Sequence, residues 1–283
     1  MASTGAFGER YGPWALVAGG SEGLGAAFAE EIARRGLNLF LVARRAEPLE
    51  KTATFVRDST GVEVRTLAAD LGSGSGLGEA TSRARDLEIG LLVCNAASSY
   101  EGPYFKADLA KYRHVIDTNC YGALALIDAA APRMRERGRG GIIVMSSMTA
   151  FQGAPYVTAY GATKAFLLAL AEGLGVEMKP MGVDVLACCP AVVRTPNYLA
   201  TRPADAKPTP VDIEPGPAAR EALDALGHRT VLIPGARARM AHAAMRLMPR
   251  SAAVAMMANS TRAMYGSAGI PAPPEGGTRS AGA

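Results

Sequence analysis

The sequence predicts a single α/β domain built on a doubly wound parallel sheet of about seven strands, with helices on both faces and a helical C-terminal extension. Three observations predict this fold class. Short apolar runs alternate with helical patterns along most of the chain. The runs are continuous rather than alternating in polarity, as in parallel strands that are covered on both faces. A glycine-rich stretch also joins the first run to the first helical pattern, where doubly wound folds place a ligand-binding turn.

Seven apolar runs are predicted as strands, at residues 14–18, 37–42, 62–68, 90–94, 141–145, 183–189 and 230–233. Between them lie helical patterns such as residues 26–35, 107–137 and 156–179. Strand–helix repetition of this kind produces parallel sheets with helical crossovers. The basic cluster at residues 133–139 falls where the second of these helices should end, and cations at that position complement the helix dipole.

The strand–helix rhythm predicts a main domain over residues 1–235 and breaks in two places. Residues 195–216 are rich in proline and polar residues, and they are longer than an ordinary connection. We expect this segment to lack packed regular structure and to act as a mobile lid over a bound substrate. Residues 236–265 are rich in Ala, Met and Arg and predict the helical extension, while residues 266–283 have the composition of a flexible tail.

Composition narrows the classes of function. The 283-residue chain is 49% hydrophobic and 20% charged, and its net charge of +4 comes from scattered Lys and Arg. No basic surface with interleaved aromatic residues is apparent, so a nucleic-acid partner is not expected. The cysteines and histidines show no metal-ligand spacing, which predicts no metal site and buried, reduced thiols; they are Cys94, Cys120, Cys188, Cys189, His114, His228 and His242.

Targeting and membrane signals are also missing from the sequence pattern. The first residues have no basic-then-apolar signal segment, and no apolar run reaches the length of a membrane span. We therefore expect a soluble, cytoplasmic protein without an integral membrane segment. Met240, Ala244, Leu247 and Met248 recur at helical spacing. They would either pack on the domain or on a second subunit, or line an apolar entrance or touch a membrane surface.

The glycine-rich stretch has the form of a dinucleotide-binding turn. It reads Gly-Gly-Ser-Glu-Gly-Leu-Gly and lies between the first predicted strand and the first predicted helix. Glycines are needed there because the backbone must turn sharply and approach a pyrophosphate, whose charge meets the helix N–H groups. We expect a Rossmann-like cofactor site formed by Gly19, Ser21, Glu22, Gly23, Leu24 and Gly25.

The end of the second predicted strand indicates which dinucleotide binds. NAD sites commonly place an acid here for the ribose 2′-hydroxyl, whereas NADP sites use arginine for the 2′-phosphate. This chain has Ala43 followed by Arg44 and Arg45, and no acid. The pattern favours NADP(H) as the cofactor.

From the glycine loop onward, over roughly residues 10–235, the sequence resembles the short-chain dehydrogenase/reductase family. The family's segments occur in order: Ala68-Ala69-Asp70-Leu71, Cys94-Asn95-Ala96-Ala97, Asp117-Thr118-Asn119-Cys120, Ser146-Ser147, Tyr160-Gly161-Ala162-Thr163-Lys164, and a segment with Pro190, Val193 and Thr195. The resemblance implies a catalytic set of Asn119, Ser147, Tyr160 and Lys164. It also implies cofactor contacts from Asp70, Leu71, Asn95, Ala96, Tyr160, Lys164, Pro190, Val193 and Thr195. Four small-residue departures, Ala18, Cys94, Ala97 and Ala191, affect only the placement of the nicotinamide.

The spacing of Tyr160 and Lys164 has a chemical rationale beside the resemblance. Residues four apart share one face of a helix, so the ammonium of Lys164 would lie beside the phenol. A free tyrosine titrates near pH 10, and a neighbouring ammonium and a nicotinamide cation would lower that pKa toward the working range. Ser147 would hold a substrate carbonyl against Tyr160. Asn119 would steady the backbone and a water chain, and Lys164 would also bind the ribose hydroxyls.

A narrower resemblance concerns the substrate. Residues 44–50 and 258–265 are similar to segments of the 17β-hydroxysteroid dehydrogenase and very-long-chain 3-oxoacyl reductase branch of the family. This implies an apolar ketone or alcohol substrate such as a steroid or a 3-oxoacyl thioester. We also expect a homodimer or homotetramer. Two alternatives are an epimerase or dehydratase of the extended family, and an NADP-binding regulatory protein without activity. Too little chain follows the last predicted strand for the first alternative, and the intact set of four residues disfavours the second.

Overall fold

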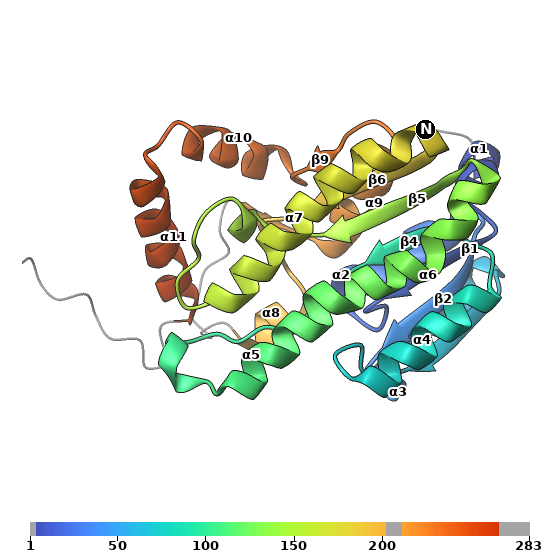
Figure 1. Cartoon of the computed structure of the whole chain (residues 1–283), viewed down its shortest axis with the longest axis horizontal. Helices are drawn as coiled ribbons and strands as arrows, with labels where there is room; N and C mark the ends of the chain where they lie inside the picture. Colours follow the sequence, from blue (N-terminus) through green and yellow to red (C-terminus); the bar gives the residue numbers. More distant parts are fainter. Residues whose placement is uncertain (1–3, 202–210, 266–283) are drawn as a thin grey trace, which may run out of the picture.

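The sheet of this protein has the predicted doubly wound order. The structure, a computed structural model, describes residues 4–201 and 211–265. Within them, seven parallel strands form one sheet in the order β3-β2-β1-β4-β5-β6-β9 (Figure 1). They are β1 (Trp14–Ala18), β2 (Asn38–Ala43), β3 (Val64–Ala68), β4 (Ile89–Cys94), β5 (Gly140–Met145), β6 (Val183–Cys188) and β9 (Val231–Leu232). The order reverses between β1 and β4, which is where doubly wound sheets bind their ligands.

Helices cover both faces of the sheet, which explains the continuous apolar runs. Neighbouring residues of one strand enter opposite cores: Leu16 belongs to the core on one face and Val17 to the core on the other. The first face carries α4 (Gly74–Asp86), α6 (Gly122–Arg137) and α7 (Thr158–Met178). The opposite face carries α1 (Thr4–Tyr11), α2 (Gly23–Ala33), α3 (Ala46–Thr60) and α9 (Pro215–Ala225). With both faces covered, the central strands β1, β4 and β5 bury every residue and have no need of polar alternation, whereas the edge strand β3 leaves Arg65 and Ala68 exposed.

The long helix predicted over residues 107–137 is interrupted. It consists of α5 (Leu109–Ile116), a π-helical turn at Asp117–Tyr121 that holds Asn119, and α6. Turns of this kind occur inside α-helices frequently at functional sites. The end of α6 follows the prediction, because Arg135 and Arg137 occupy its last turn and Gly138 closes it with a left-handed φ of 65°.

The expectation that residues 195–216 lack packed regular structure is wrong for part of the segment. Pro196–Thr201 forms a short helix, α8, and β8 (Asp212–Ile213) pairs with β7 (Val192–Val193). The helix begins because Thr195 Oγ1 accepts a hydrogen bond from the N–H of Tyr198 at 3.2 Å, and Pro196 requires no N–H partner in a first turn. Residues 202–210 lie outside the described residues, so the lid stays a prediction.

The C-terminal extension is helical, as predicted. It consists of α10 (Ala236–Met245) and α11 (Arg250–Tyr265), which meet at a corner and extend away from the sheet (Figure 1). The first of the two helices, α10, contacts the loop that follows β5, where the ring centroids of His242 and Phe151 lie 4.1 Å apart. In the described ranges, no helix combines the length and apolar character needed to cross a membrane. The predicted tail, 266–283, lies outside those ranges.

Candidate active site

Two cavities lie at the carboxyl ends of the strands and share part of their lining. The glycine-loop cavity, of about 490 Å³, is bordered by the loop after β1 and by the residues that follow β2, β3 and β4. The tyrosine cavity, of about 320 Å³, is bordered by the segments after β4, β5 and β6 and by α7 and α11. The residues common to both are Leu24, Asn95, Ala97, Ser98, Ser99, Glu101, Thr195 and Asn197. A molecule bound in one cavity would therefore touch a molecule bound in the other.

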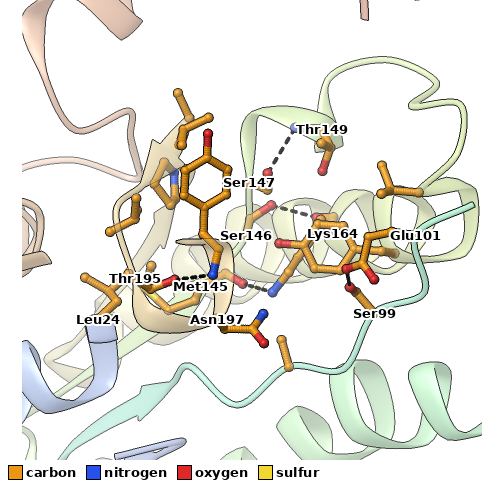
Figure 2. Close-up of a pocket in the computed structure, with 18 of the residues that line it drawn as sticks. Leu24, Ser99, Glu101, Met145, Ser146, Ser147, Thr149, Lys164, Thr195 and Asn197 are labelled. Carbon is orange, nitrogen blue, oxygen red and sulfur yellow. Dashed lines mark hydrogen bonds between the residues drawn. The ribbon is translucent and has the colours of Figure 1, made fainter. Parts of the chain in front are cut away.

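Ser147, Tyr160 and Lys164 all line the tyrosine cavity. Figure 2 shows Ser147 and Lys164 at this cavity. Ser147 follows the end of β5, and its hydroxyl accepts a hydrogen bond from the N–H of Thr149 at 3.2 Å. Tyr160 and Lys164 lie one turn apart on α7, with the ammonium 5.3 Å from the phenol ring centroid. The Lys164 side chain is 2% exposed, and its Nζ donates to the Met145 carbonyl at 2.7 Å. Residues distant in the sequence are thus brought to one wall, as their motifs predict.

Asn119 acts from behind this wall and borders neither cavity. It is 1% exposed. Its side-chain oxygen accepts from the Ser98 N–H at 2.7 Å, and its nitrogen donates to the Ser98 carbonyl at 3.0 Å and to Thr163 Oγ1 at 2.9 Å. Thr163 in turn donates to the carbonyl of Tyr160 at 2.7 Å. Asn119 therefore connects the loop after β4 to the turn of α7 that carries Tyr160.

The charges at the wall differ from the sequence expectation in one respect. Burial raises the pKa of Tyr160 to about 12, with a hydrogen bond to Ser147 acting in the opposite direction and the charge of Glu101 adding to the rise. Burial lowers the pKa of Lys164 to about 8, partly countered by nearby cysteines. The net shift of the Tyr160 pKa that the chain's own groups produce is therefore upward, whereas the downward shift expected from the sequence includes a bound nicotinamide cation. Loss of hydration outweighs the ammonium, which bonds to the Met145 carbonyl.

The glycine loop has the close packing that a phosphate cradle requires. Gly19 and Gly23 have positive φ angles of 79° and 55°, which side chains rarely adopt. A Cβ atom on Gly25 would lie 1.9 Å from the Gly19 carbonyl oxygen, so a side chain there would displace the loop. Asn95 Nδ2 donates to the same oxygen at 3.1 Å. The first turn of α2 begins at Gly23, and its N–H groups are available for an anion. The loop therefore fits a dinucleotide pyrophosphate.

Most of the predicted cofactor residues border the glycine-loop cavity: Gly19, Ser21, Glu22, Gly23, Leu24, Arg44, Arg45, Asp70, Leu71, Asn95, Ala96 and Thr195. Pro190 and Val193 border the tyrosine cavity instead. Gly25 borders neither and supports the loop from below. Asp70 uses one carboxylate oxygen to accept from the Gly72 N–H at 2.9 Å, which shapes the turn after β3.

The two predicted arginines have different surroundings. Arg45 forms an ion pair with Glu22 across the rim of the glycine-loop cavity. The Arg44 guanidinium, also at the rim, has no hydrogen-bond or ion-pair partner within residues 4–201 and 211–265. Arg44 is therefore the arginine that is available to a phosphate, while Arg45 holds the rim together.

Several lining residues are not anticipated by the sequence motifs. Ser99 and Glu101 follow β4, and Met257, Thr261 and Met264 reach the tyrosine cavity from α11. The similarity at residues 258–265 is the signal that could have found the last two. No pattern in the sequence places Glu101 at both cavities, because its position depends on how the loop after β4 folds back.

A doubly wound sheet with a phosphate cradle beside a Ser–Tyr–Lys wall defines a dinucleotide-dependent oxidoreductase site. Comparison with known proteins agrees. Residues 13–206 match the family described as short chain dehydrogenase, and the chain belongs to the short-chain dehydrogenase/reductase family. These enzymes use NAD(P)H, and this protein is an oxidoreductase of that family.

Two relatives and two solved structures illustrate the similarity. A 7beta-hydroxysteroid dehydrogenase of Clostridium sardiniense is 31% identical over 81% of this chain and 88% of its own. A very-long-chain 3-oxoacyl-CoA reductase of Anas platyrhynchos is 33% identical over 72% of this chain and 67% of its own. A 7beta-hydroxysteroid dehydrogenase structure superposes with a TM-score of 0.82 at 28% identity, covering 89% of this chain and 98% of that one. A Sphingobium yanoikuyae dehydrogenase in complex with NADPH has a TM-score of 0.72 at 32% identity, covering 84% and 97%.

Proposed function

We propose that this protein is an NADP(H)-dependent enzyme that interconverts a bulky apolar ketone and its secondary alcohol, with Tyr160 as the general acid and base. One observation carries the proposal: Ser147, Tyr160 and Lys164 border a cavity that Met257 and Met264 of α11 also line and that shares part of its lining with the glycine-loop cavity. The residues common to the two cavities would hold the nicotinamide, which would supply the hydride chemistry at the substrate carbon. The protein supplies the proton, the orientation and the exclusion of water.

Each polar residue of the wall has a distinct task. The Ser147 hydroxyl binds the substrate oxygen and orients it toward the Tyr160 hydroxyl. Tyr160 is protonated at neutral pH because burial raises its pKa to about 12, so it is ready to donate a proton to that oxygen during reduction. Lys164 presents a buried cation beside the phenol and stabilises the phenolate that remains. Asn119 keeps the loop after β4 aligned with α7 through its bonds to Ser98 and Thr163.

The preference for NADP(H) rests on Arg44. It borders the glycine-loop cavity at the end of β2, and the described residues supply it with no acidic partner. A guanidinium makes bidentate hydrogen bonds to a phosphate, so the 2′-phosphate of NADP(H) suits this position. The Sphingobium yanoikuyae relative was solved with NADPH, which supports the proposal.

Replacing Arg44 with aspartate is expected to reverse or abolish the cofactor preference. In the wild-type protein, NADPH should bind at least about tenfold more tightly than NADH, because a charge-assisted bidentate contact is worth more than 1 kcal/mol. The dissociation constants of both cofactors, measured by fluorescence titration, check the prediction. Arg237→Asp is a matched control, because Arg237 lies on α10 and borders neither cavity. Equal wild-type dissociation constants would rule out the role given to Arg44.

The substrate class follows from the apolar part of the tyrosine cavity. Leu24, Val157, Tyr198, Met257 and Met264 contribute to its lining, and methionines adapt to irregular apolar shapes. A steroid or a 3-oxoacyl thioester suits such a cavity, and the relatives named above include enzymes for both.

A substrate panel tests the whole proposal. The wild-type protein should oxidise NADPH in the presence of at least one steroid ketone, 3-oxoacyl thioester or bulky aryl ketone. The value of kcat/KM should rise with the apolar size of the ketone until the cavity is filled. The decrease in NADPH absorbance gives the rate. Absence of NADPH oxidation with every ketone would contradict the proposal and favour a binding protein without turnover.

A further inference from the structure

The charged side chains of the tyrosine cavity are few and unevenly placed. Among the described residues that border it, Glu101 and Lys164 alone carry a formal charge. Lys164 is buried, and its ammonium donates a hydrogen bond to the Met145 carbonyl. Glu101 is half-buried, so its carboxylate is the charge that an incoming substrate meets. In Figure 2, Glu101 and Ser99 lie on the right of the view, and Leu24 and Thr195 lie on the left.

We propose that Glu101 determines which substrates this cavity accepts. Its carboxylate would accept a hydrogen bond from a hydroxyl or another donor on the ketone near the reacting carbonyl, and it would repel ketones with a carboxylate at that place. This inference rests on the proposed ketone reductase function and specifies the substrate class further: a neutral, apolar ketone with a hydrogen-bond donor close to its carbonyl.

Local contacts fix the position of the carboxylate. The Ser99 hydroxyl donates to Glu101 Oε1. The other carboxylate oxygen, Oε2, has no hydrogen-bond partner within the described part of the chain. The next residue, Gly102, has a φ of 144° and donates its N–H to the Tyr156 carbonyl at 2.7 Å. Glu101 is therefore held at the cavity by contacts on both sides, and one oxygen remains available to a ligand.

The neighbouring groups leave that negative charge uncompensated at the cavity. Arg262 on α11 donates to the Tyr156 hydroxyl at 2.9 Å and does not border the cavity. No ion pair joins Glu101 to any cation of the described residues. A substrate carboxylate placed here would meet a like charge at short range, which is unfavourable. A substrate hydroxyl would gain a charge-assisted hydrogen bond, which is stronger than one between neutral groups.

The Tyr160 phenol responds to the same charge. The groups that act on it are Ser147, which donates a hydrogen bond, Lys164, whose ammonium lies 5.3 Å from its ring, and Glu101, which raises its pKa. Removing the negative charge should therefore lower the pKa of Tyr160. Alcohol oxidation requires the unprotonated phenol of Tyr160. The rate of alcohol oxidation should therefore begin to rise at a lower pH in Glu101→Gln than in the wild type.

Binding of a matched ligand series tests the proposal. We would measure the dissociation constants of a tetralone, a hydroxytetralone and a tetralone carboxylate by calorimetry, on wild-type protein and on Glu101→Gln, both saturated with NADP⁺, which cannot reduce the ketones. In the wild type, the hydroxyl compound should bind most tightly and the carboxylate most weakly. In Glu101→Gln the affinity for the tetralone carboxylate should rise about tenfold, because a like-charge contact is removed. The affinity for the hydroxytetralone should fall. Glu177→Gln is the control: Glu177 is exposed on α7, borders neither cavity and should change nothing.

The outcomes separate the two proposals. If no ketone is turned over, the proposed function fails, while the binding series still reports on Glu101. If ketones are turned over but Glu101→Gln leaves the carboxylate-to-neutral affinity ratio unchanged, Glu101 does not determine selectivity. An unchanged pH profile for alcohol oxidation in Glu101→Gln would show that Glu101 does not influence the pKa of Tyr160.

Discussion

Replacing Tyr160 with phenylalanine is expected to lower kcat by a factor of about 10² to 10⁴, the usual contribution of a positioned general acid. Only the hydroxyl is removed, so the ring still packs beside Lys164 and the lining of the glycine-loop cavity is unchanged. The dissociation constant of NADPH should therefore stay within about threefold of the wild-type value. Steady-state kinetics and fluorescence titration on the same preparation measure the two effects.

A second tyrosine variant serves as the control for this prediction. Tyr121 is 61% exposed and borders neither cavity, so Tyr121→Phe should retain wild-type kcat and cofactor binding. If Tyr160→Phe keeps near wild-type turnover, another group must donate the proton and the assigned mechanism is wrong. If it loses cofactor binding together with turnover, Tyr160 has a structural role that the observed contacts do not explain.

Replacing Gly25 with alanine is expected to damage both stability and cofactor binding. The added Cβ would lie 1.9 Å from the Gly19 carbonyl oxygen and 2.8 Å from Asn95 Nδ2. Neither can move freely, because the first is backbone and the second bonds to that same oxygen. Overpacking of this kind costs about 3 kcal/mol, which lowers the melting temperature by roughly 6–12 °C in a chain of this size. The affinity for NADPH should fall at least about tenfold, since the loop that holds the pyrophosphate must shift.

Gly78→Ala provides a matched control on α4. A Cβ there meets nothing within 4 Å and the backbone is helical, so the substitution should stabilise the protein by about 0.5–1 kcal/mol. Thermal unfolding with and without NADPH measures both variants. A Gly25→Ala protein that melts and binds like the wild type would show that the loop tolerates a side chain and that its close packing is not required.

The sequence anticipates the parts of this molecule that depend on local pattern. Continuous apolar runs predict the central strands because these are buried on both faces, and the helical spacing of Tyr160 and Lys164 predicts their shared wall. The π-helical turn at Asn119 escapes such reasoning, because the buried positions Val115, Asn119 and Leu126 keep the spacing of an ordinary α-helix. The helix after Thr195 is not among the predicted elements, although Thr-Pro is a recognisable helix start.

Features that depend on distant segments are harder to predict. The raised pKa of Tyr160 follows from burial that the whole fold creates, whereas the motif identifies only its immediate neighbours. The place of Glu101 at the junction of two cavities depends on a loop that Asn119 and Tyr156 hold from other elements. Neither the raised pKa of Tyr160 nor the position of Glu101 is marked by a residue spacing in the sequence, because both arise from tertiary packing rather than from helix or strand periodicity.

The C-terminal extension supplies one part of the substrate side of this enzyme from a separate length of chain. All four residues assigned to chemistry precede residue 165, whereas Met257, Thr261 and Met264 close the tyrosine cavity from α11, nearly a hundred residues later. Arg262 anchors that helix to the Tyr156 hydroxyl, at a distance in sequence from the cofactor loop. Exchanging residues 236–265 between relatives should therefore alter the part of the substrate range that depends on Met257, Thr261 and Met264, without changing the cofactor choice.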